Sequence, residues 1–162
     1  ATLAQTYARA PYKDVMMGVA ERVYTLRSDW LLDLAQESTL ALAAAFGLRV
    51  PAPRAASSLG VAGRSSERVL AVVSLLGGAR YVTGHGAKAY LDHLAFEQAG
   101  IAVEYMSYRK APYRQLHGAF TPYVSALDLL ANEGPAGSRF IGSGAIPWRA
   151  ALAIDSSPPV LA

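Results

Sequence analysis

Cysteine is absent from the 162 residues of this sequence, which excludes disulfides, thiolate nucleophiles and cysteine-ligated metal centres. Charged residues are scarce at 17%, and the 15 Lys and Arg side chains form no basic run of the kind that binds duplex nucleic acid. No stretch reaches the roughly 18 to 20 apolar residues of a membrane span. The sequence therefore predicts a cytoplasmic protein with neither nucleic acid nor membrane among its partners.

Several common catalytic motifs are also missing. The sequence has no Gly-x-Ser-x-Gly nucleophile elbow and no Gly-Lys-Ser/Thr phosphate loop, and its Gly84-His85-Gly86 turn lacks the third glycine of the dinucleotide fingerprint. The 3 histidines form no His-x-x-x-His pair, so we predict no metal site. Ligases, transferases and binding modules remain open.

What the sequence does contain is 52% hydrophobic residues, arranged in helical and strand patterns. Apolar residues recur at a spacing of three and four from Pro11 to Leu26, which is typical of one face of a helix. A second helix is expected to open at Ser28 or Asp29, either of which can cap it, and to end at Gly47. The first part of the chain is therefore predicted to form a pair of packed helices.

A serine- and glycine-rich segment over residues 54–66 follows and contains Ser57 and Ser58. It fits either a phosphate-facing loop or an ordinary surface loop, and composition alone favours the surface loop. The helix expected next, which begins at Ser65 or Ser66 and ends at Leu76, is apolar nearly all round. We therefore expect that helix to be deeply buried.

Residues 80–100 carry the clearest functional pattern. A strand over 79–83 runs into the glycine turn 84–86, a helix is expected over 87–100, and a strand with alternating apolar residues follows over 101–105. A strand that leads through glycines into a helix N-terminus can present backbone N–H groups to an anion. The order of elements predicts an α/β fold, with a parallel sheet and flanking helices in a three-layer, Rossmann-like arrangement.

Each of the three histidines has a functional and a structural interpretation. His85, between the two glycines, is a candidate base or phosphate partner, although its position alone slightly favours a plain turn histidine. His93 is expected to be a partly buried, hydrogen-bonded helix residue. His117 lies in an aromatic loop and is either functional or simply exposed.

The last third of the chain begins with a long polar and aromatic connection over residues 107–120, of a length that is often functional or mobile. The next helix is expected to be capped by Thr121, with Pro122 at its first position. Ser125 and Asp128 on that helix can hold a ligand hydroxyl or amine, and Asp128 can equally cap the helix or pair with a basic side chain. We predict one α/β domain over residues 1–134 and a Gly-, Ser- and Pro-rich extension with limited docking over residues 135–162.

Three segments in order, YVTGHGAKAYLD, AFEQAGIAVEYMSY and PYRQLHGAFTPYVSALDLLANEG, resemble the WbqC-like family, which is found among polysaccharide and natural-product biosynthetic genes. In that family Tyr-x-Ser/Thr-Gly-x-Gly leads into Tyr-Leu-Asp, and Tyr-x-Gln later precedes Phe-x-Pro and Ser-x-x-Asp-Leu. The segment Ser57-Ser58-Leu59 is similar to the family too. The residues that match the motifs are Tyr81, Thr83, Gly84, Gly86, Tyr90, Leu91, Asp92, Tyr113, Gln115, Phe120, Pro122, Ser125, Asp128 and Leu129.

The front of the chain departs from the family pattern. Members usually begin with a strand and a motif close to His-Gln-Pro-x-Tyr-Phe-Pro, and nothing like it precedes Tyr12. The resemblance therefore implies the C-terminal two-thirds of a member, a partial domain that lacks its N-terminal strand. Loss of that strand would expose a sheet edge or an apolar face, which makes a homo-oligomer a candidate assembly.

The resemblance implies a biosynthetic enzyme with a small-molecule substrate: a transferase or ligase for acyl or amide transfer on an amino sugar or amino-acid-derived intermediate, with a nucleotide as candidate cofactor. His85 and Asp128 would be catalytic. The alternative, favoured by the apolar composition and the absent nucleophile, is a non-catalytic scaffold or partner-binding domain in a biosynthetic complex. The residues expected to bind substrate or phosphate are Ser57, Ser58, Thr83, Gly84, Gly86, Tyr90, Tyr113, Gln115 and Ser125.

Overall fold

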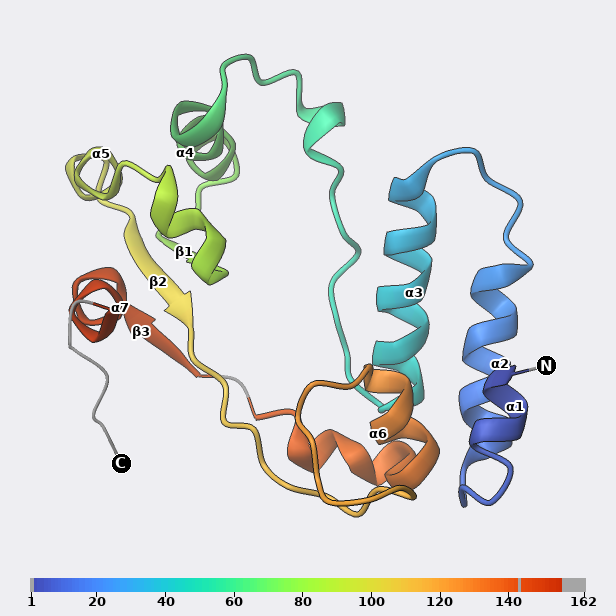
Figure 1. The fold of residues 1–162 in the computed structure, drawn as a ribbon. Coiled ribbons are helices and arrows are strands. Elements are labelled where there is room, and N and C mark those ends of the chain that lie inside the picture. Colours follow the sequence, from blue (N-terminus) through green and yellow to red (C-terminus); the bar gives the residue numbers. More distant parts are fainter. Residues whose placement is uncertain (1, 143, 156–162) are drawn as a thin grey trace. The chain divides into compact units, whose positions relative to one another are not determined.

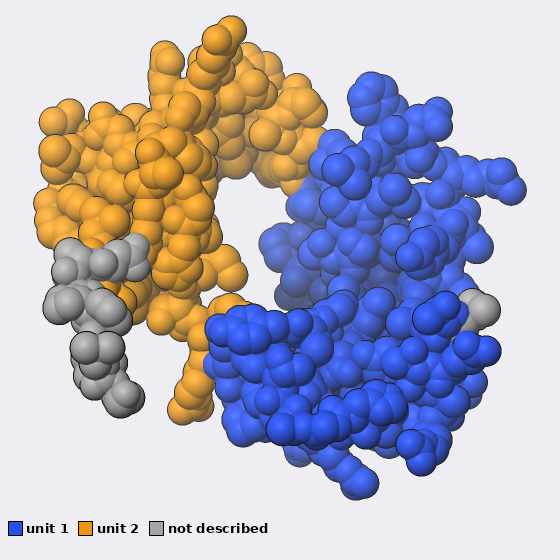
Figure 2. Space-filling model, in the orientation of Figure 1, with its two compact units in different colours: residues 1–53, 110–142 blue, residues 54–109, 143–162 orange. Residues whose placement is uncertain are grey.

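The computed structural model describes residues 2–142 and 144–155 (Figure 1). The chain divides into two compact units (Figure 2): unit 1 combines residues 1–53 and 110–142, and unit 2 combines residues 54–109 and 143–162. Each unit has its own hydrophobic core. None of the helices within the described residues is long and apolar enough to cross a membrane.

Unit 1 is helical, and its helices pack around one core. The predicted helix pair is confirmed, because α2 and α3 lie side by side (Figure 1) and α6 packs against both. The core residues Met16, Phe46, Leu129, Leu130 and Ala131 come from all three helices and their ends. The elements of unit 1 are α1 (Thr2–Thr6), α2 (Lys13–Tyr24), α3 (Leu31–Ala45), α6 (Ala126–Glu133) and the 3₁₀ helix η3 (Gly134–Phe140).

Two helix starts in unit 1 differ from the prediction, and side-chain hydrogen bonds explain both. The hydroxyl of Ser28 accepts the Trp30 N–H and donates to the Asp33 carboxylate, so α3 begins only at Leu31. Thr121 does not cap the following helix, because its backbone N–H and C=O both bond to the side-chain amide of Gln115. Ser125 caps α6 instead, accepting the Leu127 N–H at 3.2 Å.

Unit 2 is built on a three-stranded sheet in the order β1-β2-β3. β1 and β2 pair in parallel, with Arg80 opposite Ala102, whereas β3 runs antiparallel to β2. Val103 and Tyr105 are buried on one face of β2, as the alternating pattern predicts. The elements of unit 2 are η1 (Ala56–Leu59), α4 (Ser65–Leu75), β1 (Arg80–Thr83), η2 (His85–Ala89), α5 (His93–Gln98), β2 (Ala102–Met106), β3 (Ala145–Pro147) and α7 (Trp148–Asp155).

The α/β class is confirmed in its general form, as a mixed fold with a small sheet and flanking helices. The sheet is mixed rather than purely parallel, because β3 joins it in the antiparallel direction. The three-layer, Rossmann-like arrangement and the missing N-terminal strand stay predictions. So does the domain boundary at residue 134.

The single helix predicted over residues 87–100 is wrong, because the chain breaks at residues 90–92 into η2 and α5. The Asp92 N–H donates to the Ser66 hydroxyl at 2.8 Å, and the Asp92 carboxylate accepts the Ala95 N–H at 3.1 Å. Asp92 therefore serves as the N-cap of α5 instead of continuing a helix from the glycine turn. Gly100 ends α5 as predicted, with a left-handed φ of +73°.

Two further expectations for unit 2 are corrected. The helix α4 is not deeply buried: Val73 alone among its residues is buried, and Leu75 is 59% exposed. The expectation of limited docking is wrong for residues 145–155, because β3 pairs with β2 and Ala151 of α7 is only 1% exposed. The rest of the predicted extension, residues 156–162, lies outside the described residues.

Candidate functional site

The predicted site residues divide between the two units. Ser57, Ser58, Thr83, Gly84, His85, Gly86 and Tyr90 belong to unit 2, whereas Tyr113, Gln115, Ser125 and Asp128 belong to unit 1. The two groups are therefore described separately.

In unit 1, two of the predicted residues, Tyr113 and Gln115, donate hydrogen bonds to the carboxylate of a third, Asp128. Asp128, in the first turn of α6, is only 8% exposed. Its Oδ2 accepts hydrogen bonds from the Tyr113 hydroxyl at 2.7 Å and from the Gln115 amide at 3.2 Å. Its Oδ1 accepts one from the Tyr7 hydroxyl at 2.8 Å. We call these four residues the Asp128 cluster.

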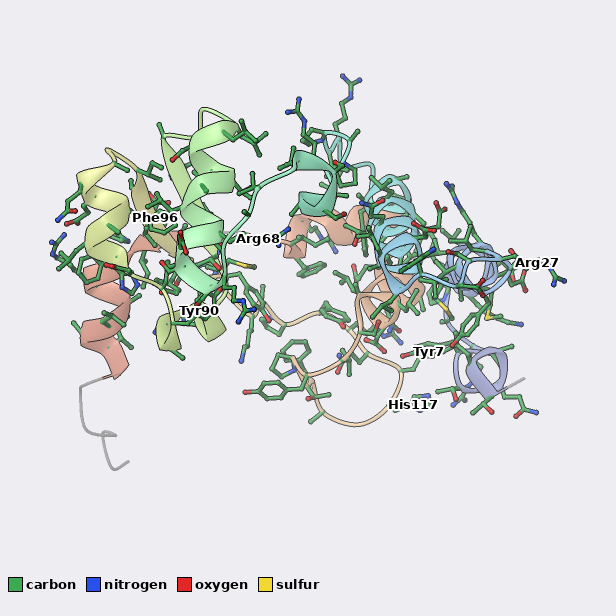
Figure 3. The ribbon with its side chains drawn as sticks, turned by 90° about the horizontal axis from the view of Figure 1, so that it is seen from above. Tyr7, Arg27, Arg68, Tyr90, Phe96 and His117 are labelled. Carbon is green, nitrogen blue, oxygen red and sulfur yellow. The ribbon has the colours of Figure 1, made fainter. Side chains whose placement is uncertain are left out.

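Tyr7 is the member of the cluster that the sequence does not reveal. It follows α1 directly and lies 121 positions from its partner Asp128. No motif marks it, and only the packing of the N-terminal segment brings its hydroxyl to the carboxylate. His117 also reaches this end of the chain, where its Nε2 lies 3.2 Å from the Thr6 carbonyl oxygen, and Figure 3 labels it near Tyr7.

The electrostatics of the cluster keep both phenols protonated. Burial and the hydrogen bond to Asp128 raise the pKa of Tyr7 to about 12. Burial and the same carboxylate raise the pKa of Tyr113 to about 12. A carboxylate oxygen can accept two hydrogen bonds, and Oδ1 has one partner among the described residues. The cluster can therefore accept a further hydrogen bond from a ligand amine or hydroxyl.

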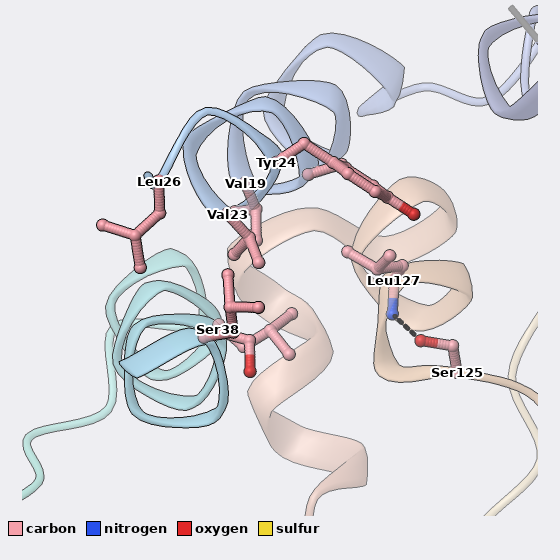
Figure 4. A pocket seen from close by; sticks show the side chains of 10 residues that line it. Val19, Val23, Tyr24, Leu26, Ser38, Ser125 and Leu127 are labelled. Atoms are coloured by element: carbon pink, nitrogen blue, oxygen red, sulfur yellow. Dashed lines mark hydrogen bonds between the residues drawn. The ribbon is translucent and has the colours of Figure 1, made fainter. Parts of the chain in front are cut away.

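Ser125 does not join this cluster, although it lies three residues from Asp128. Its hydroxyl caps α6 and lies at an apolar pocket of about 570 Å³ (Figure 4). Side chains of α2 and α3 form most of the wall, and α6 begins at its edge. The lining residues are Val19, Ala20, Val23, Tyr24, Leu26, Leu34, Ser38, Leu42, Ser125 and Leu127.

In unit 2, the glycine turn has a different structure from the predicted one. Gly84 is extended, and residues 85–89 form the short 3₁₀ helix η2 rather than the first turn of a long α-helix. The helix-terminus argument for an anion site at this turn therefore does not apply. His85 is exposed, and its Nε2 lies 2.9 Å from the Met106 carbonyl oxygen, which accepts a hydrogen bond from it. An anion site at the turn stays a prediction that rests on the family motif.

The other hydroxyls predicted in unit 2 have local partners. Ser58 donates to the Ala55 carbonyl at 2.8 Å within η1, and Thr83 accepts from the Tyr81 hydroxyl at 3.3 Å. Both contacts lie within a few residues in sequence, so neither by itself indicates a ligand. Ser57 and Ser58 are exposed, as the surface-loop interpretation also expects.

His93 has the buried environment that its position predicts. It is 9% exposed, its Nε2 lies 2.7 Å from the Tyr105 hydroxyl, and its ring stacks on Trp148 at 4.5 Å. Lys88 also contacts Tyr105, with its ammonium 5.4 Å from the ring centroid. Burial lowers the pKa of His93, and this effect outweighs the opposite influence of Asp92 and Glu97.

The lowered pKa of His93 predicts a loss of stability in mild acid. In the unfolded chain the His93 imidazole binds a proton near pH 6.5, whereas in the folded chain its lowered pKa delays protonation. The contribution of neutral, buried His93 to the free energy of unfolding is therefore fully present above about pH 6.5 and is lost as the pH falls below that value. Urea denaturation between about pH 7 and pH 5 measures this slope. His93→Gln keeps a partner for Tyr105 and should flatten the curve, whereas His117→Gln, at an exposed histidine, should leave it steep. An unchanged slope in His93→Gln would contradict the assignment.

Within the described residues, no group of three or more His, Asp or Glu side chains is placed to hold a metal ion. In unit 1, the predicted polar residues that the structure brings together are those of the Asp128 cluster. They suit a ligand with hydrogen-bond donors.

Comparison with known proteins places the chain in a family. The model of the WbqC-like protein family matches residues 1–140, so the chain belongs to that family. It is also similar to Rv1507c of Mycobacterium tuberculosis, a protein described as uncharacterized, with 39% identity over 72 residues. That similarity covers 43% of this chain and 30% of the length of Rv1507c. No solved structure shows significant similarity to the chain.

Proposed function

We propose that the chain is part of a biosynthetic enzyme of polysaccharide or natural-product pathways. The proposed reaction is acyl or amide transfer, or ligation, on an amino sugar or amino-acid-derived intermediate, with a nucleotide as cofactor and the cytoplasm as location. Family membership supports the biosynthetic setting. The similarity to Rv1507c covers only 30% of the length of that protein, so the activity of a whole protein is part of the proposal.

The observation that carries the proposal is the convergence of Tyr113 and Gln115 on Asp128. Tyr113 and Gln115 belong to one family motif and Asp128 to another, and they come together with Tyr7 around the buried Asp128 carboxylate. A fixed carboxylate with remaining acceptor capacity suits an ammonium group, because charge-assisted hydrogen bonds are stronger than neutral ones. In this role Asp128 orients the amine that receives the acyl group.

The test compares two sugars that differ in one group, glucosamine and glucose. Chemical shifts in NMR titrations of the chain should show that glucosamine binds at least about tenfold more tightly, which corresponds to about 1.4 kcal/mol. Asp128→Asn should remove this preference, and Tyr123→Phe, at a tyrosine that is 82% exposed, should retain it. Equal affinities for both sugars, or a preference that survives Asp128→Asn, would contradict the proposal.

A second candidate function, a scaffold that associates with another copy of itself, is favoured by exposed apolar side chains between α2 and α3. Tyr24 is 89% exposed, Trp30 is 74% exposed and Leu31 is 79% exposed. Large exposed apolar groups close together in sequence are typical of interaction surfaces. Sedimentation separates the candidates: a dimer that dissociates in Trp30→Ser, together with no sugar binding, favours the scaffold.

A further inference from the structure

Unit 2 contains an open pocket of about 530 Å³ on the face where α4 meets the segment after η2. Ser65, Arg68 and Val69 of α4 line it, together with Tyr90 from the break between η2 and α5. Figure 3 labels Arg68 and Tyr90 on these neighbouring elements. The residues of the pocket therefore come from two separate parts of the chain.

Arg68 differs from the other arginines in its burial, because every other arginine of the chain is exposed. Among those exposed arginines, Arg22, Arg80, Arg139 and Arg149 each pair with a glutamate. Arg68 is half-buried at the pocket, and in the described part of the chain no carboxylate pairs with it. A guanidinium that no carboxylate neutralises attracts an anion, and partial burial of the residue lowers the effective dielectric around that interaction.

A hydrogen bond links the two walls of the pocket, in addition to the core in which Val69 and Leu91 both pack. The Ser66 hydroxyl, in the first turn of α4, accepts the Asp92 N–H at 2.8 Å. This bond ties the segment that carries Tyr90 to the helix that carries Ser65 and Arg68. The same bond that ends the predicted long helix therefore brings the Tyr90 side chain to the pocket.

We propose that Ser65, Arg68 and Tyr90 bind the phosphoryl group of a substrate or cofactor. Arg68 supplies the charge and a planar set of N–H donors, and the hydroxyls of Ser65 and Tyr90 add two further donors. Val69 and the Tyr90 ring offer apolar surface to the group attached to the phosphate. The inference rests on the proposed function for a phosphate-bearing ligand, and it moves the anion from the glycine turn to α4.

Isothermal titration calorimetry of the chain with ADP, glucose 1-phosphate and inorganic phosphate tests the pocket. Arg68→Gln should weaken binding of the phosphate compounds at least about tenfold, and Arg68→Lys, which keeps the charge but loses the planar donors, should weaken it less. Arg64→Gln is the matched control, because Arg64 is exposed, lies four residues earlier and does not line the pocket. It should change affinity by less than about twofold. Tightest binding of ADP indicates a nucleotide, and equal binding of all three indicates that the phosphoryl group suffices.

Three outcomes would overturn the site: no binding of any phosphate compound, equal weakening by Arg64→Gln and Arg68→Gln, or loss of binding in His85→Ala but not in Arg68→Gln. The last result would return the anion to the glycine turn. Failure of the amine proposal is seen separately, because glucosamine binding is measured at Asp128 in unit 1. The two proposals can therefore fail independently.

Discussion

Asp128→Ala should lower the free energy of unfolding by about 2–4 kcal/mol. The substitution removes the acceptor of three hydrogen bonds and leaves the hydroxyls of Tyr7 and Tyr113 without their partner in a half-buried environment. Each partly buried donor left unsatisfied costs about 1–3 kcal/mol, less where water can reach it. Asp128→Asn keeps the shape and one acceptor oxygen, and it should cost less than Asp128→Ala.

Urea denaturation followed by circular dichroism measures this loss. Asp14→Ala provides the matched control, because Asp14 also lies in the first turn of its helix but is exposed. It should change stability by no more than about 0.5 kcal/mol. If Asp128→Ala were as mild as Asp14→Ala, the cluster would contribute nothing to the stability of the fold, which would contradict the prediction.

The raised tyrosine pKa values give the same cluster a spectroscopic readout. The pKa values of Tyr7 and Tyr113 are about 12 in the folded chain, above the value of about 10 in the unfolded chain. Their contribution to the free energy of unfolding is therefore fully present below about pH 10 and is lost as the pH rises towards 12. Absorbance titration should therefore show late phenolate transitions for Tyr7 and Tyr113, beside that of Tyr105, whose pKa burial also raises. The transitions of Tyr7 and Tyr113 should move towards lower pH in Asp128→Asn, and Tyr123→Phe should affect neither.

Phe96→Ala should lower the free energy of unfolding of unit 2 by about 3–5 kcal/mol. Phe96 is fully buried, at 0% exposure, and its ring stacks on Tyr81 of β1 at 5.6 Å. It joins α5 to the sheet within the core formed with Val103 and Tyr105. Truncation leaves a cavity at the centre of a small core, where few neighbouring side chains can move to fill it.

The chain offers both a reporter and a control for this prediction. In a Trp30→Phe background, the fluorescence of Trp148 reports on unit 2 alone, because the chain has only 2 tryptophans. Leu94→Ala changes the same helix at a side chain that is 57% exposed, and it should cost far less than Phe96→Ala. Equal losses in the two variants would show that Phe96 does not anchor the core.

The sequence predicts those parts of the fold that depend on near neighbours. The helices α2 and α3, the strands β1 and β2, and the turn at Gly100 follow from apolar spacing and from the left-handed conformation that glycine adopts easily. The buried face of β2 follows from alternation alone. The break before α5 does not, because the hydroxyl of Ser66, 26 positions away, accepts the Asp92 N–H. The start of α6 does not either, because Gln115 binds the backbone of Thr121 and leaves Ser125 as the cap.

The candidate site shows the same division. Family motifs point to Tyr113, Gln115 and Asp128, but nothing in the sequence points to Tyr7 or Arg68. Ser65 lies in the serine-rich segment 54–66, for which composition alone favours a surface loop over a phosphate-facing one. Tyr7 reaches Asp128 across 121 positions, and Ser66 holds Asp92 across 26. Contacts at such separations leave no periodic trace in the sequence, because each depends on one side chain meeting one partner.

The sequence by itself therefore determined the family, the α/β class and the residue types available for chemistry, since these depend on composition, local pattern and ordered motifs. Tertiary structure alone decided how those residues are used. It surrounded Asp128 with three donors and brought Tyr90 to a pocket with Arg68. The physical reason is that hydrogen bonding and burial are set by the packing of distant segments, which gives each polar side chain its partners.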